Sequence, residues 1–130
     1  MKVTVLSLVA SLTSFLIAGP VVAGSKQSNP VSVSQSGRVA TGALGAGRNS
    51  TDGVQYIGCG VTAGASGAWT AFCFAQPPVG AGAFCVSTVP GIVQTVLSMS
   101  GDSNIYFNWD ATQTCVSVYV ENMSFWEPKR

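Results

Sequence analysis

The chain has 130 residues, with six lysines and arginines, five aspartates and glutamates and no histidine, so its formal net charge is +1. This length indicates one domain at most, and the absence of histidine excludes Ser-His-Asp and Cys-His catalytic arrangements. The basic residues are few and scattered, so they form no cluster that could neutralise the phosphates of a nucleic acid. We therefore expect no nucleic-acid partner.

Residues 1–23 have the pattern of a secretory signal peptide. One lysine precedes an apolar run from Val3 to Ala18, and Gly19-Pro20 then leads to small residues ending at Ala23. This pattern predicts cleavage after Ala23, and no later apolar run is long enough to cross a bilayer. We expect a secreted product, either extracellular, periplasmic or at the cell surface. The predicted mature chain carries five basic and five acidic residues, and zero net charge favours self-association.

Residues 24–53 are predicted to form a Gly/Ser-rich flexible arm. They are rich in Gly, Ser, Asn, Gln and Ala and contain few large apolar side chains, a composition typical of a disordered linker. Val31 and Val33 nevertheless alternate with serines, which suits a strand that lies on the edge of a sheet. The arm could therefore add this strand to a neighbouring molecule.

Residues 54–130 are predicted to form a single β-rich domain stabilised by disulfides. Short runs rich in β-branched and aromatic residues, separated by Gly and Pro turns, predict three consecutive strands. These strands are expected at residues 54–61, 69–76 and 83–88.

A helix and two further strands are expected after this meander. Residues 88–101 have apolar side chains at helical spacing, with Pro90 near the first turn and Gly101 at the end. Apolar and polar side chains alternate with a period of two over residues 104–109 and 114–121, as they do in strands. The sequence therefore predicts an α+β, mostly β fold, with a small antiparallel sheet of about five strands and one short helix. The alternative is a small β-sandwich that includes the arm.

Four cysteines, Cys59, Cys73, Cys85 and Cys115, lie in this domain. An even number in a short exported chain indicates two disulfides. Their spacing, without any histidine, does not fit a zinc site, and we expect neither a metal nor another cofactor. We favour Cys59 with Cys73 across a hairpin and Cys85 with Cys115 on the last strand. Pairing of Cys73 with Cys85 stays open, because these residues also flank a turn.

Catalytic residues are not predicted, because the acidic residues fall mainly in turns and no general base accompanies the serines. We therefore expect a nonenzymatic protein. Tyr56, Tyr106 and Tyr119 fall on predicted strands and are candidates for a ligand face, since tyrosines offer a flat apolar ring and a polar hydroxyl.

These observations predict a secreted, nonenzymatic structural or interaction protein of the cell surface or extracellular matrix. In this hypothesis the arm strand at Val31 and Val33 joins copies into a homo-oligomer or filament. One alternative is a carbohydrate-binding module that uses the three tyrosines to bind an extracellular polysaccharide. Another is a secreted effector or inhibitor.

Overall fold

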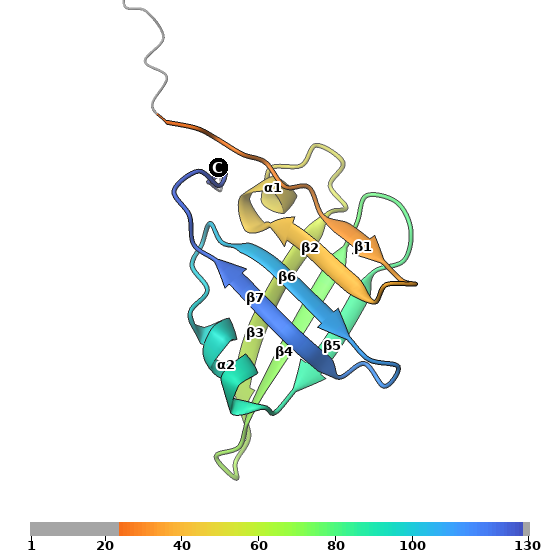
Figure 1. Ribbon diagram of the computed structural model, residues 1–130, viewed down its shortest axis with the longest axis vertical. Coiled ribbons are helices and arrows are strands. Elements are labelled where there is room, and N and C mark those ends of the chain that lie inside the picture. Colours follow the sequence, from red (N-terminus) through yellow and green to blue (C-terminus); the bar gives the residue numbers. More distant parts are fainter. Residues whose placement is uncertain (1–23, 129–130) are drawn as a thin grey trace, which may run out of the picture.

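The computed structural model describes residues 24–128 and contains two antiparallel sheets packed face to face, whose strands cross each other in projection (Figure 1). The predicted signal peptide, residues 1–23, lies outside the described residues. The four-stranded sheet has the order β1 (Ser32–Ser34), β2 (Val39–Ala43), β6 (Asn104–Trp109), β7 (Cys115–Glu121). The three-stranded sheet has the order β3 (Tyr56–Ala63), β4 (Trp69–Gln76), β5 (Ala83–Ser87).

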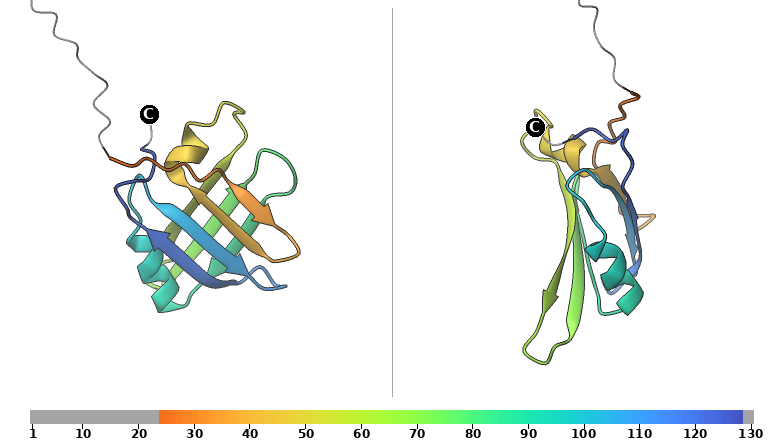
Figure 2. Two further views of the ribbon diagram at one scale, coloured as in Figure 1. Left: turned by 45° about the horizontal axis from the view of Figure 1, so that its top comes forward. Right: turned by 90° about the vertical axis from the view of Figure 1, so that its left-hand side faces the viewer.

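Two short helices lie at the margins of the two sheets. Helix α1 (Leu44–Arg48) follows β2 directly and contacts β3. Helix α2 (Pro90–Leu97) lies beside β7 and contacts β3 and β4, so it closes one side of the space between the sheets (Figure 2). Proline at the start of α2 suits a first turn whose N–H groups have no partner in the helix. The helix predicted within residues 88–101 is confirmed, although it ends at Leu97.

The mostly β, disulfide-bonded fold is confirmed, but the number of strands differs from the prediction. Strands β4 and β6 have the predicted bounds, whereas seven strands in two sheets replace a single sheet of about five. The arrangement corresponds to the two-sheet alternative that includes the arm. Strands β1 and β2 and helix α1 all come from residues 24–53, which the sequence predicts to be flexible.

Small side chains explain why this segment folds despite its composition. Ala40 and Ala43 on β2 are fully buried, and β2 pairs with β6 from Val39↔Asn108 to Ala43↔Asn104. At Gly42 an added Cβ would lie 3.1 Å from the Cα of Val31, so the close approach of the two chain segments depends on glycine. Close packing of alanine and glycine buries this segment without large apolar residues.

The core between the sheets combines large side chains from one sheet with small ones from the other. Phe107 and Ile105 on β6 are completely buried. The inward-facing residues of β4 are Ala71, Cys73 and Ala75, each at most 1% exposed. This complementarity in size keeps the two sheets close, as dense packing requires. It also leaves the larger residues of β4 on the opposite face.

Candidate functional site

The outer face of the three-stranded sheet is mostly apolar and partly exposed to solvent. Side chains alternate between the two faces of a strand, so the neighbours of Ala71, Cys73 and Ala75 point outward. We define the aromatic face as the outward-facing large apolar residues of this sheet: Tyr56, Phe72, Phe74, Phe84 and Val86.

The three phenylalanine rings of the aromatic face contact one another across β4 and β5. The ring centroids of Phe74 and Phe84 are 4.7 Å apart, and those of Phe72 and Phe74 are 5.8 Å apart in an edge-to-face arrangement. Phe74 is 41% exposed and Tyr56 is 53% exposed. Aromatic pairs at such distances attract one another beyond the burial of their area, so the three phenylalanine rings form one connected surface.

Glycine on β3 allows a ring to lie directly over the backbone. An added Cβ at Gly60 would lie 2.6 Å from the ring of Phe72, which is closer than two carbon atoms can approach. Strands β3, β4 and β5 contain no Asp, Glu, Lys or Arg. The aromatic face is therefore flat on the β3 side and has no charged side chain of its own sheet.

The aromatic face extends over all three strands of its sheet. Eight residues at about 3.3 Å per residue and three strands about 4.8 Å apart give a sheet about 26 Å long and about 14 Å wide. An exposed apolar patch of a few hundred square ångströms on a soluble protein commonly marks a site of interaction.

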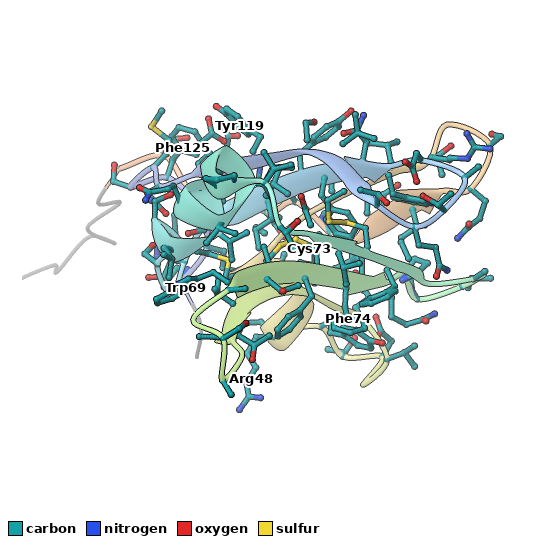
Figure 3. The ribbon with its side chains drawn as sticks, turned by 90° about the horizontal axis from the view of Figure 1, so that it is seen from below. Arg48, Trp69, Cys73, Phe74, Tyr119 and Phe125 are labelled. Carbon is teal, nitrogen blue, oxygen red and sulfur yellow. A yellow bond between two sulfur atoms is a disulfide. The ribbon has the colours of Figure 1, made fainter. Side chains whose placement is uncertain are left out.

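The three tyrosines expected to form a ligand face are divided between the two sheets. Tyr106 on β6 lies directly opposite Tyr119 on β7, and both are exposed on the outer face of the four-stranded sheet. Thr41 on β2 is the next residue in this row. Tyr56 belongs to the other sheet, and Figure 3 shows Tyr119 and Phe74 on opposite sides of the molecule. The structure thus brings together two of the three tyrosines.

The four cysteines form the two disulfides that we favoured. Cys59 and Cys73 are paired across β3 and β4, with their Cα atoms 4.0 Å apart. Cys85 on β5 is bonded to Cys115 on β7, so this disulfide joins the two sheets. The sulfur atoms of Cys73, Cys85 and Cys115 lie within 4.8 Å of one another, but they are disulfide sulfurs and not the thiolates that bind metals.

The predicted arm strand pairs within its own chain. Val33 on β1 lies opposite Ala40 on β2. Val31 is 3% exposed, and its backbone N–H donates a hydrogen bond of 2.9 Å to Oε1 of Gln55. Both valines therefore already make contacts within their own chain. Strand β1 is an end strand of the four-stranded sheet.

Asp52 organises the loop that leads into β3. Its Oδ1 accepts hydrogen bonds from the backbone N–H groups of Val54 (2.7 Å) and Gln55 (2.9 Å), and the side-chain amide of Gln55 donates to Oδ2. These bonds, above all the one from the Gln55 side chain, lower the pKa of Asp52 from 3.8 to about 2.

Asp110 lies in the turn before β7. Several hydrogen bonds lower the pKa of its carboxyl, and the strongest effect comes from the hydroxyl of Thr112.

Acid is expected to destabilise the fold through Asp52. Because the pKa of this carboxyl is lower in the folded state than in the unfolded chain, its ionised form stabilises the fold above about pH 4. That stabilisation is lost as the pH falls through about 2. Urea unfolding at a series of pH values should show stability declining across this window, and Asp52→Asn should give a flatter profile. Equal slopes for the two proteins would contradict this role of Asp52.

The aromatic face was missed because the expected pattern assumes that large side chains point inward. The alternation of Phe72 and Phe74 with Ala71, Cys73 and Ala75 is visible in the sequence. A period of two shows that the phenylalanines share a face, but it does not show which face is buried. The only available signal was the small size of all three alternating partners.

A groove of about 540 Å³ adjoins the end of the same sheet, between β4 and α2. Its walls include the exposed side chains of Trp69 and Leu97, with Val93 among the lining residues.

Within residues 24–128, no helix is long and apolar enough to cross a membrane. The two disulfides are compatible with an extracellular location.

In comparisons with known proteins, the chain matches no family model, no curated protein and no solved structure.

Proposed function

We propose that this chain is a secreted, nonenzymatic interaction protein of the cell surface or extracellular matrix that binds through the aromatic face. The observation that carries this proposal is the exposure of Tyr56, Phe74 and Val86 on a sheet whose strands contain no charged residue. A solvent-facing sheet usually carries polar residues, and solvent exposure of aromatic rings is costly unless a partner covers them. The aromatic face replaces the arm strand as the proposed contact, since β1 already pairs with β2.

The second candidate function is carbohydrate binding by Tyr106 and Tyr119. Their direct opposition on β6 and β7 favours it. The flanking polar residues also favour it, because Thr41 and Ser117 offer hydroxyl groups on the same face. A sugar ring has an apolar face that can stack on a tyrosine and hydroxyl groups that need hydrogen-bond partners.

A pair of matched substitutions separates the two functions. Phe74→Ser and Tyr119→Ser each remove one exposed aromatic ring from the outer face of a strand, one on each sheet. We expect Phe74→Ser to reduce retention on phenyl-substituted polymer beads several-fold, because it removes the ring that contacts both Phe72 and Phe84. Tyr119→Ser should leave this retention unchanged.

The same two variants are then tested on insoluble cellulose and chitin. Retention of the wild type that is abolished by Tyr119→Ser and kept by Phe74→Ser would support carbohydrate binding instead. If Phe74→Ser, shown to be folded by its circular dichroism, is retained on the phenyl beads as strongly as the wild type, the proposed role of the aromatic face is wrong.

A further inference from the structure

The hydrogen bonds of the β3–β4 hairpin show which peptide groups of β3 point away from β4. At the turn, the N–H of Gly64 donates to the carbonyl of Ala68 over 3.0 Å, so these two residues form a hydrogen-bonded pair. Hydrogen-bonded and non-hydrogen-bonded pairs alternate along an antiparallel ladder. Cys59 and Cys73 are therefore a non-hydrogen-bonded pair, and their Cα separation of 4.0 Å agrees with the closer spacing of such pairs.

The peptide groups of Cys59, Val61 and Ala63 consequently point outward from the end strand of the sheet. Among residues 24–128, none of the hydrogen bonds outside the regular ladders involves these three peptide groups. Ile57 has the same orientation, but Gly47 of α1 lies beside its nitrogen. We call the outward peptide groups of Cys59, Val61 and Ala63 the open edge.

The other end strands of the two sheets are shorter or covered. On β5, the N–H of Val86 donates to the carbonyl of Gln113 over 3.0 Å. Strand β7 has α2 beside it (Figure 2), and the side-chain amide of Asn122 joins its end to Ser98. Helix α2 also contacts β3, but within residues 24–128 no backbone hydrogen bond joins it to the open edge. Strand β1 has only three residues. Natural proteins usually shorten, cover or charge such edges to avoid association, whereas β3 has eight residues and no charge.

We infer that the open edge binds β3 of a second copy of this chain, in antiparallel orientation about a two-fold axis at Val61. This inference deepens the proposed function, on which it rests, by naming a partner for the sheet that carries the aromatic face. In this register Val61 lies opposite Val61 of the second copy, and Cys59 lies opposite Ala63 of that copy. The three outward peptide groups of each copy then face each other, so the contact is self-complementary, as a two-fold interface requires.

The side chains next to the axis are compatible with this pairing. An added Cβ at Gly58 would meet nothing within 4 Å, so the outer face beside the open edge has room for side chains of the second copy. No like charges approach each other, because β3 contains no charged residue. The Cys59–Cys73 disulfide holds β3 against β4, so the open edge is ordered before it binds and little conformational freedom is lost.

Pairing at the open edge also joins the two aromatic faces. A continuous six-stranded sheet about 28 Å wide would present both sets of rings on one side, at about 4.8 Å per strand. The area of this six-stranded outer face approaches the roughly 800 Å² that each partner contributes to a standard protein interface. One three-stranded sheet alone does not reach this area. The edge contact itself is small, so we expect a reversible dimer whose population depends on concentration.

The test is sedimentation equilibrium of the full secreted protein in oxidised form over a hundredfold range of concentration. The wild type should approach the mass of a dimer at high concentration. Val61→Pro should weaken dimerisation at least tenfold, because proline removes an outward N–H that the sheet does not use and obstructs the edge. Thr62→Lys provides a second variant that keeps every backbone donor and places two like charges beside the axis.

Ser32→Pro is the matched control on the end strand of the other sheet. The turn hydrogen bond from Arg38 to Gln35 places the N–H of Ser32 outward by the same alternation, so this variant should dimerise like the wild type. Hydrogen exchange adds a residue-specific measurement: the amides of Cys59, Val61 and Ala63 should become protected as the concentration of wild type rises.

A wild type that remains monomeric throughout, or folded Val61→Pro and Thr62→Lys variants that dimerise normally, would overturn the inference. Loss of dimer in Ser32→Pro alone would assign self-association to β1 instead. The phenyl-bead assay keeps the two proposals apart. Val61→Pro should still be retained on the beads, whereas failure of the proposed function appears as unchanged retention of Phe74→Ser.

Discussion

Replacing both Cys85 and Cys115 with alanine is expected to lower the free energy of unfolding by about 4 kcal/mol, because this disulfide closes a long loop of chain. The two residues are 30 positions apart, and the bond joins β5 of one sheet to β7 of the other. Both are almost completely buried. A domain of this size is stabilised by only about 5–15 kcal/mol in total, so the variant should unfold at a markedly lower urea concentration.

Removal of the other disulfide is the matched control. Cys59 and Cys73 are 14 positions apart and lie in one hairpin, where the β3–β4 ladder already holds them together. The shorter loop predicts a smaller loss of about 3 kcal/mol. Urea unfolding of the two double variants, analysed with one shared dependence of the unfolding free energy on urea concentration, measures the difference between the two losses. A larger loss from the Cys59 and Cys73 replacements would contradict the view that the link between the sheets is the stronger constraint.

Phe107→Ala is expected to cost about 3–5 kcal/mol, the usual penalty for deleting a fully buried aromatic ring. Phe107 lies at the centre of the four-stranded sheet, between Ala40 on β2 and Val118 on β7. It is completely buried, and its ring centroid is 5.9 Å from that of Trp109. The small residues of β4 on the facing sheet cannot extend to fill the space, so a cavity would remain.

Phe74→Ala removes the same atoms from the aromatic face and serves as the control. Phe74 is 41% exposed, so its replacement forfeits only part of the transfer free energy and should cost about 1 kcal/mol. Unfolding in urea, with both variants compared with the wild type, gives the two losses directly. Equal losses would mean that the outer face contributes to stability as the core does, which would remove the main argument for its role in binding.

Local patterns in the sequence were sufficient to predict several elements and the disulfides. Alternation over Trp69–Gln76 and Asn104–Trp109 gave strands with the observed bounds. The turn between the first two predicted strands places Cys59 opposite Cys73. These features depend on neighbours in the chain, and the period of two and the chemistry of turns act at that range.

The segment from residue 24 to residue 53 could not be predicted in this way, because its burial depends on residues far away in the chain. Ala40 and Ala43 are buried by β6 and the facing sheet. At Gly45, an added Cβ would overlap the carbonyl oxygen of Glu127, so the C-terminal segment packs directly on the backbone of α1. Neither partner is visible from the composition of the segment, which by itself resembles that of a linker.

By itself, then, the sequence determined a mostly β chain with two disulfides, one of its helices and the alternation that places Phe72 and Phe74 on one face of β4. Which face of that strand meets the core was decided only by the tertiary structure. The large residues of β6, with Phe107 among them, fill the space between the sheets, so only small residues of β4 fit opposite them. Phe72 and Phe74 lie on the outer face for this reason, Phe74 exposed and Phe72 half-buried. The candidate binding surface thus results from packing between distant strands.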